Sequence, residues 1–114
     1  MANNFPLIES ILFYTISLMR TIHTTEAFDY WFFGLRDRVA QRRIQARIRR
    51  AELGNFGDCE PVGEGVSEMR IHYGPGYRVY FVQRGTEIVI LLAGGDKSTQ
   101  SKDIQTARDL VRQL

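Results

Sequence analysis

Hydrophobic and polar positions change their spacing several times along the chain, and each spacing predicts a different element. Residues 19–24 alternate apolar and polar side chains, which is typical of a short strand. Two stretches then repeat apolar side chains every three or four positions, the pattern of amphipathic helices. Thr24 or Thr25 can cap the first helix, and Asp37 can cap the second, which should end near Gly54. We therefore predict a strand followed by an antiparallel helical hairpin.

The second half of the chain has the composition and spacing of a sheet. Residues 55–65 predict a loop, because Gly, Pro, Asp and Asn favour turns. Three strand-like runs follow at 66–73, 77–83 and 86–93, and Gly-containing turns between them predict an antiparallel meander. Residues 101–114 have the spacing of a short amphipathic helix. The expected fold class is therefore α+β, with a strand, a helical hairpin, a three-stranded antiparallel meander and a short C-terminal helix.

The length of 114 residues favours a single domain. The first 18 residues of the chain differ from the rest because most of them form one apolar run. The apolar run from Phe5 to Leu18 is shorter than the roughly 20 residues that cross a bilayer, and Glu9 interrupts it. A secretory signal would have Lys or Arg before this apolar run, and none is present. We expect residues 1–18 to be a poorly ordered extension and residues 19–114 to form the domain of a cytoplasmic protein with no membrane partner.

Arginine is concentrated in the second predicted helix. Seven arginines lie between Arg36 and Arg50 against one acid, Asp37, although the formal net charge is only +2. Such a surface favours an anionic partner, either nucleic acid or an acidic protein segment. The same pattern is also common on helices whose charges are simply solvated. The candidate contacts to nucleic acid or to a partner are Arg42, Arg43, Arg47 and Arg50.

Metal and disulfide chemistry find little support in the composition. Cys59 is the only cysteine, so the chain has no disulfide framework and no cysteine cluster. The two histidines, His23 and His72, do not have the spacing of a zinc site. We therefore expect neither a metal ion nor a cofactor.

The turn Gly74-Pro75-Gly76 joins two strands that are unusually rich in basic and aromatic side chains. A symmetric three-residue loop would place Tyr73 opposite Tyr77, His72 opposite Arg78 and Arg70 opposite Tyr80. Because side chains alternate along a strand, one face of the hairpin is then apolar. The other, exposed face would gather Arg70, His72, Arg78 and Tyr80.

This set of side chains suits RNA cleavage by attack of a 2′-hydroxyl on the adjacent phosphate. Arg70 and Arg78 could contact the phosphate and its transition state. His72 could act as base or acid, and Lys97, just beyond the third strand, could contact the phosphate or transfer a proton. The candidates for substrate binding, by stacking on unpaired bases, are Tyr80, Tyr77 and Tyr73. Opposed His, Arg and Tyr side chains are also frequent on exposed strands without any catalytic role.

Three segments carry a family resemblance: FDYWFFGLRDRVAQRRIQARIRRAELGNFGD, GEGVSEMRIHYGPGYRVYF and LLAGGDKSTQSKDIQTA. Together they resemble the RelE/ParE superfamily of bacterial toxins, and in particular its HigB-like addiction module killer branch, which is similar to phage-derived Gp49 proteins. The resemblance begins at about Met19, and residues 1–18 have no counterpart. It implies the same α+β arrangement and the toxin role in a type II toxin-antitoxin system. It also matches the catalytic basic residues of such toxins with Arg70, Arg78 and Lys97.

The resemblance implies partners as well as a fold. RelE-like and HigB-like toxins enter the ribosome and cut mRNA, and the antitoxins of this branch are small helix-turn-helix proteins that can bring operator DNA into the complex. The leading expectation is therefore a metal-independent, ribosome-dependent mRNA endonuclease. Two alternatives stay open: a ParE-like DNA gyrase poison without nuclease activity, and a non-catalytic binding module that acts with its antitoxin as a DNA-bound repressor.

Overall fold

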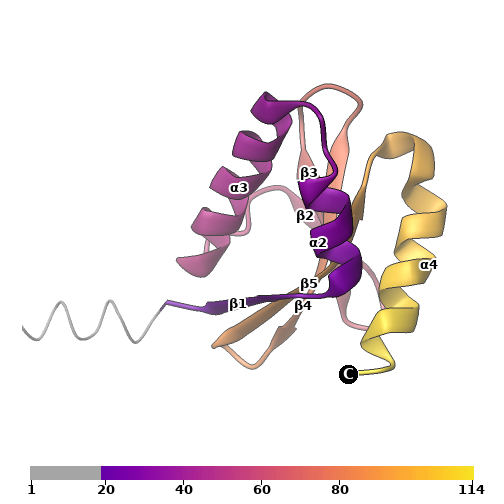
Figure 1. Cartoon of the computed structure of the whole chain (residues 1–114). Helices are drawn as coiled ribbons and strands as arrows, with labels where there is room; N and C mark the ends of the chain where they lie inside the picture. The colour runs from indigo at the N-terminus through magenta and orange to yellow at the C-terminus, as the bar shows by residue number, and fades with distance from the viewer. Residues whose placement is uncertain (1–18) are drawn as a thin grey trace, which may run out of the picture.

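The computed structural model describes residues 19–114 of the chain (Figure 1). The predicted extension, residues 1–18, lies outside this described range. The elements in chain order are β1 (Thr21–Thr24), α2 (Glu26–Phe33), α3 (Arg38–Glu52), β2 (Cys59–Gly63), β3 (Val66–Ile71), β4 (Tyr77–Arg84), β5 (Ile88–Gly95), the short 3-10 helix η1 (Lys97–Thr99) and α4 (Gln100–Val111). The strands form one five-stranded sheet in the order β1-β5-β4-β3-β2. The predicted α+β fold class is confirmed.

The sheet is mixed and has one more strand than the sequence indicated. β1 pairs with β5 in parallel, and the other neighbours are antiparallel. The interpretation of residues 55–65 as a loop throughout is wrong, because Cys59–Gly63 forms the edge strand β2. Pro61 lies in this strand, and an edge position tolerates the missing N–H. The turn-forming composition therefore concealed a strand that only its pairing with β3 reveals.

Both predicted N-caps of the helical hairpin are confirmed. The Thr25 hydroxyl accepts a hydrogen bond from the Phe28 amide at 3.1 Å at the start of α2. The Asp37 carboxylate accepts hydrogen bonds from the Val39 and Ala40 amides at 2.9 and 3.1 Å at the start of α3. These contacts satisfy amide groups that have no partner inside the first helical turn.

Asp37 links the start of α3 to the β3–β4 loop, because its other carboxylate oxygen accepts a hydrogen bond from the Tyr73 hydroxyl at 2.8 Å. We expect Asp37→Ala to lower the midpoint of thermal unfolding by a few degrees, since it removes the cap and this tertiary contact together. Tyr73→Phe removes only the tertiary contact and should lower the midpoint less. Equal losses for the two variants, measured by circular dichroism, would show that the cap contributes nothing.

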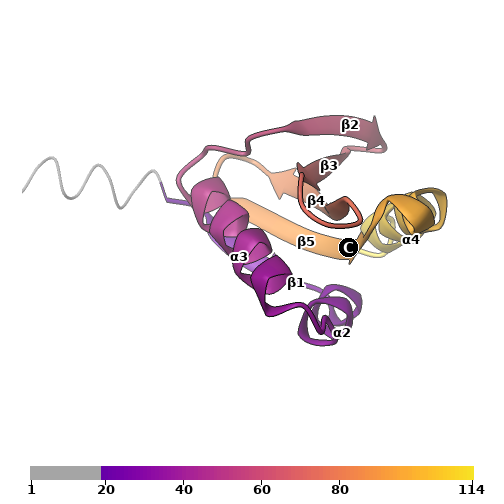
Figure 2. The same ribbon diagram turned by 90° about the horizontal axis from the view of Figure 1, so that it is seen from above.

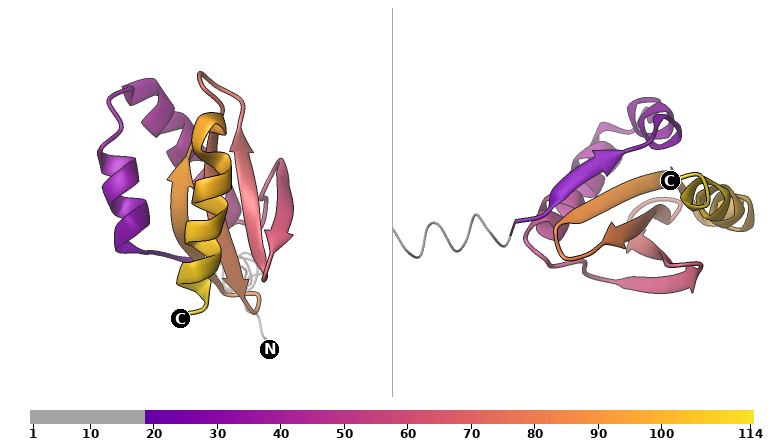
Figure 3. Two further views of the ribbon diagram at one scale, coloured as in Figure 1. Left: turned by 90° about the vertical axis from the view of Figure 1, so that its right-hand side faces the viewer. Right: turned by 90° about the horizontal axis from the view of Figure 1, so that it is seen from below.

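Helices cover both faces of the sheet (Figures 2 and 3). On one face, the buried Phe28 of α2 and Ile44 of α3 pack against Met69, Val79 and other apolar residues of the strands. On the other face, α4 packs through Ala107 against a second apolar cluster that includes Tyr80 and Leu92. The expectation that this second face is exposed is therefore wrong over the part of the sheet that α4 covers.

Two successive glycines allow helices to approach β5 closely from opposite faces. A Cβ atom on Gly94 would lie 2.1 Å from Cε3 of Trp31 in α2. A Cβ atom on Gly95 would lie 1.8 Å from a carboxylate oxygen of Asp103 in α4. Because successive residues of a strand point to opposite faces, each glycine makes room for one helix.

Candidate functional site

The ends of three elements meet at an open pocket on the sheet. The pocket is lined by the end of β3, the β3–β4 loop, the start of β4 and the first residue of η1, and its volume is about 490 Å³. We call it the β3–β4 pocket. All four residues that the sequence suggested as catalytic line it: Arg70, His72, Arg78 and Lys97.

The predicted register of the hairpin is wrong by two positions. Arg70 lies directly opposite Arg78, and Tyr80 lies opposite Glu68. The connection is longer than a three-residue turn, because β3 ends at Ile71 and β4 begins at Tyr77. A shift of two positions leaves every side chain on the face that the sequence predicts. Arg70 and Arg78 therefore still share a face, and they lie closer together than expected.

His72 does not belong to the strand face, because β3 has already ended. Its side chain is exposed, and its Nε2 atom lies 2.6 Å from a carboxylate oxygen of Asp58 in the segment before β2. The hydrogen bond with His72 holds the pKa of Asp58 below its usual value, with further contributions from the charges of His72, Arg70 and Arg47. The imidazole is thus oriented at the rim of the pocket by a charged carboxylate.

The expectation that Tyr80 stacks on a base from an exposed face is wrong, because its side chain is fully buried. Burial also raises the pKa of its phenol, and its hydroxyl donates a hydrogen bond to Glu68 at 3.0 Å. Tyr77 is nearly buried, and its ring lies 6.3 Å from the ring of Trp31. Neither ring is accessible to an unpaired base in this structure.

Tyr73 is the candidate substrate-binding tyrosine that lines the pocket. One neighbour of its ring is Tyr77, stacked at 6.5 Å between centroids, and another is the Arg43 guanidinium, 4.8 Å from the ring centroid. The hydrogen bond to Asp37 raises the pKa of the Tyr73 phenol. Its ring is therefore fixed on several sides and supports the loop that forms the pocket.

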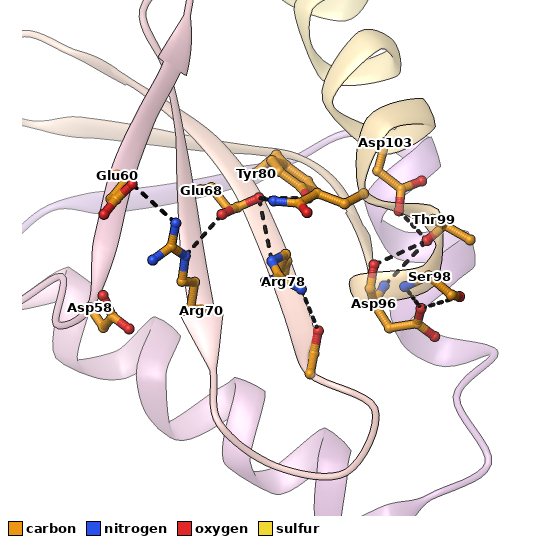
Figure 4. A network of polar contacts seen from close by, with 12 residues as sticks. Asp58, Glu60, Glu68, Arg70, Arg78, Tyr80, Asp96, Ser98, Thr99 and Asp103 are labelled. Carbon is orange, nitrogen blue, oxygen red and sulfur yellow. Dashed lines mark hydrogen bonds and ion pairs between the residues drawn. The ribbon is translucent and has the colours of Figure 1, made fainter.

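A buried carboxylate orients both arginines (Figure 4). Glu68 has 0% relative exposure, and its Oε1 atom accepts a hydrogen bond from Arg70 Nε at 3.0 Å. Its Oε2 atom lies 3.4 Å from Arg78 Nε and also accepts a hydrogen bond from Gln100 Nε2 at 2.8 Å. Arg70 reaches a second carboxylate, Glu60 of β2, at 3.0 Å. The two guanidinium groups are therefore held in place before any ligand is bound.

The environment keeps Glu68 ionised. Burial favours the neutral acid and is the largest influence on its pKa, but hydrogen bonds from Gln100, Arg70 and Tyr80 act in the opposite direction. Together with the charge of Arg78, they bring the pKa below its usual value. The result is a charged network in which every component depends on the others.

Lys97 reaches the pocket from a separate element. It is the first residue of η1, whose start is fixed by a hydrogen bond from the Ser98 amide to the Asp96 carboxylate at 2.8 Å. The Lys97 amide donates to the Pro75 carbonyl at 3.4 Å, which joins η1 to the β3–β4 loop. Its side chain is exposed and forms no ion pair with a carboxylate within residues 19–114.

The four candidate arginines of α3 differ in what they contact. Arg47 points inward, where its guanidinium donates hydrogen bonds to the carbonyl oxygens of Arg70 and Phe56. Arg43 and Arg50 line a groove beside His72. Arg42 lies in another groove, with Phe32 and Phe33 of α2. The structure therefore brings two of the four, Arg43 and Arg50, close to the β3–β4 pocket as exposed side chains.

Comparison with known proteins identifies the family of this chain. The model of a family described as "Phage derived protein Gp49-like" matches residues 31–112, a range that contains every residue of the β3–β4 pocket. The chain belongs to this Gp49-like family. A protein of Haemophilus influenzae (strain ATCC 51907 / DSM 11121 / KW20 / Rd) described as "Uncharacterized protein" is 50% identical over 93 residues, which cover 82% of this chain and 94% of the relative.

Sequence reasoning missed the acids of the site in this Gp49-like protein. Glu68 and Arg70 are two positions apart in one strand, so the alternation that placed Arg70 also placed Glu68 on the same face. That signal was available in the sequence. The contributions of Asp58, Glu60 and Gln100 were not, because these residues reach the site through strand pairing and helix packing.

Within residues 19–114 no group of three or more His, Cys, Asp or Glu side chains could hold a metal ion. No helix in the same range is long and apolar enough to cross a membrane.

Proposed function

We propose that this Gp49-like protein is the toxin of a type II toxin-antitoxin pair and that it cleaves mRNA on the ribosome without a metal ion. The observation that carries the proposal is the convergence of Arg70, Arg78, Lys97 and His72 on one open pocket. Cleavage by a 2′-hydroxyl needs positive charge at the phosphate and a group that exchanges protons. The pocket offers both.

The two arginines provide the seat for the phosphate. Arg70 and Arg78 lie opposite each other on β3 and β4, and Glu68 fixes both. A guanidinium group offers two parallel N–H donors that match phosphate oxygens, and its charge persists at every physiological pH. Because Glu68 is buried behind the arginines, they can stabilise the developing phosphorane charge without first reorganising.

His72 and Lys97 provide the proton chemistry. The Nε2 atom of His72 is engaged by Asp58, which leaves Nδ1 to exchange a proton with the 2′-hydroxyl or the departing 5′-oxygen. Lys97 approaches the same pocket from η1 and supplies either a further phosphate contact or the second proton transfer. Tyr73 contributes by holding the loop between these groups.

The proposal includes the partners that such a toxin requires. They are the ribosome with its mRNA, a cognate helix-turn-helix antitoxin, and operator DNA through that antitoxin. The protein would act in the cytoplasm. Arg43 and Arg50 of α3 support the RNA partners, since they are exposed beside His72 and cationic side chains attract polyanions.

The direct test is induction of the protein in growing cells with and without its neighbouring gene, followed by mapping of RNA 5′ ends. We expect new 5′ ends within translated mRNA and growth arrest, both suppressed by the neighbouring gene. Growth arrest with intact transcripts and a DNA-damage response would replace this proposal with the gyrase alternative. Promoter binding without growth arrest would favour the repressor alternative.

A further inference from the structure

A second basic groove adjoins the β3–β4 pocket, and His72 lines both. The groove has a volume of about 270 Å³ and runs between α3 and the end of β3. We call it the α3 groove. Its lining residues are Arg43, Ala46, Arg47, Arg50, Ile71 and His72.

The two hollows differ in how their positive charge is balanced. In the β3–β4 pocket, Arg70 and Arg78 are both paired with Glu68. In the α3 groove, no arginine forms an ion pair with a carboxylate of the described residues. The nearby carboxylate of Asp58 is already engaged by His72. The α3 groove therefore carries an excess of positive charge that the fold itself does not balance.

The arginines of the groove are close enough to affect one another. Burial lowers the pKa of Arg47, and the charge of Arg50 lowers it further. Arg47 donates its Nη groups to backbone carbonyls, and its Nε atom is buried without a hydrogen-bond partner. A bound anion would relieve this repulsion, because it adds the negative charge that the groove lacks.

Part of the groove is also rigid before binding. Arg47 is fixed by the carbonyls of Arg70 and Phe56, and Arg43 lies over the ring of Tyr73 at 4.8 Å. Arg50 is exposed at the end of α3. An extended polyanion that starts at His72 can therefore contact the prearranged guanidinium group of Arg43 at a small entropic cost, and the exposed Arg50 further along the helix.

We propose that the α3 groove is a subsite for the phosphodiester adjacent to the one held in the β3–β4 pocket. A single RNA strand would cross His72 at the junction of the two hollows, with Arg43 and Arg50 binding its backbone. Guanidinium groups suit this role because they contact phosphate oxygens through paired N–H donors whatever the base. The identity of the ligand as RNA rests on the proposed function. The location of the subsite rests on the arginines of the α3 groove, which form no ion pair within residues 19–114, and on His72, which lines both hollows.

Binding of a 2′-O-methyl RNA hexanucleotide, which the 2′-hydroxyl mechanism cannot cleave, tests the subsite by fluorescence anisotropy. We expect the double variant Arg43→Ala/Arg50→Ala to weaken binding by about tenfold at low salt. The slope of the logarithm of the association constant against the logarithm of the salt concentration is negative, and its magnitude should fall by about 1.4, because each phosphate contact to a single strand contributes about 0.7. A 2′-O-methyl dinucleotide contains one phosphodiester, so its binding in the β3–β4 pocket should change little.

The matched control is Arg38→Ala/Arg49→Ala, which removes two exposed arginines of the same helix that line other grooves and not the α3 groove. We expect this control to bind the hexanucleotide like the wild type. Equal weakening by the two double variants would overturn the subsite in favour of diffuse attraction. The subsite would also be overturned if Arg43→Ala/Arg50→Ala bound the hexanucleotide as tightly as the wild type does. The same holds if this double variant weakened binding of a duplex DNA but not of the hexanucleotide.

The binding test separates this proposal from the proposed function. A protein that cuts mRNA in cells but shows no dependence on Arg43 and Arg50 would lose the subsite and keep the endonuclease activity. A protein that binds RNA through these arginines but leaves mRNA intact would keep the subsite and lose the endonuclease activity.

Discussion

Glu68→Ala is expected to lower the free energy of unfolding by about 3–5 kcal/mol, the usual cost of removing one partner from a buried ion pair. The side chain of Arg78 is only 14% exposed, and Glu68 is the carboxylate that balances its charge. The same substitution removes the acceptor for the Tyr80 hydroxyl and for the Gln100 amide. Buried donors without an acceptor add to the loss of stability. Urea denaturation followed by circular dichroism measures the difference.

Glu60→Ala is the matched control, because Glu60 is a second carboxylate partner of Arg70 but is 60% exposed. An exposed ion pair contributes little, so this variant should unfold close to the wild type. Similar unfolding of the two variants would show that Glu68 is not the centre of the network.

Acid unfolding gives an independent measure of the same carboxylate. The pKa of Glu68 is lower in the folded protein than its usual value of about 4.3. Its charged form therefore stabilises the fold above that value, and this contribution is lost as the pH falls through the folded pKa. Glu68→Gln keeps the size of the side chain but does not titrate at this position. We expect its stability to depend less steeply on pH in this acidic range than that of the wild type.

Lys97→Ala is expected to reduce mRNA cleavage by roughly a hundredfold, the order of magnitude for losing one charge-stabilising contact to a transition state. The side chain is exposed, so the midpoint of thermal unfolding should not change measurably. Cleavage is measured from the appearance of new RNA 5′ ends after induction, with the amount of protein checked in the same cells.

Lys102→Ala removes the same charge from an exposed position in α4 outside the β3–β4 pocket. This control should cleave mRNA like the wild type. Equal activity of Lys97→Ala and wild type would remove Lys97 from the proposed mechanism. Equal losses in both variants would point to the overall charge of the protein as the cause.

Substitutions of Arg70 and Arg78 separate an effect on activity from an effect on stability less cleanly than Lys97→Ala does. The sequence predicts that Arg70 and Arg78 lie on an exposed face of the hairpin. In the structure both are bound to the buried Glu68, and Arg78 is itself largely buried. Arg78→Ala is therefore expected to lose stability together with activity, and Lys97 is the better probe of function.

Local patterns in the sequence were sufficient for much of this protein. Thr25 and Asp37 were identifiable as caps because short polar side chains before an amphipathic run satisfy the first helical amides. The alternation of side chains placed Arg70 and Arg78 on one face, and that result survives a register error of two positions. Both features depend on residues that are close together in the chain.

Only the tertiary structure decided which of these side chains are buried and which are paired. Tyr80 was expected to be exposed because nothing near it in the sequence shows that α4, which begins 20 residues later, covers its face. Helical spacing likewise leaves open which arginines of α3 meet the pocket, until packing of α3 on the sheet turns Arg47 inward and brings Arg43 and Arg50 beside His72. The periodicity of side chains and the capping of helices arise from local backbone geometry. Burial and ion pairing depend on contacts between segments that are distant in the chain.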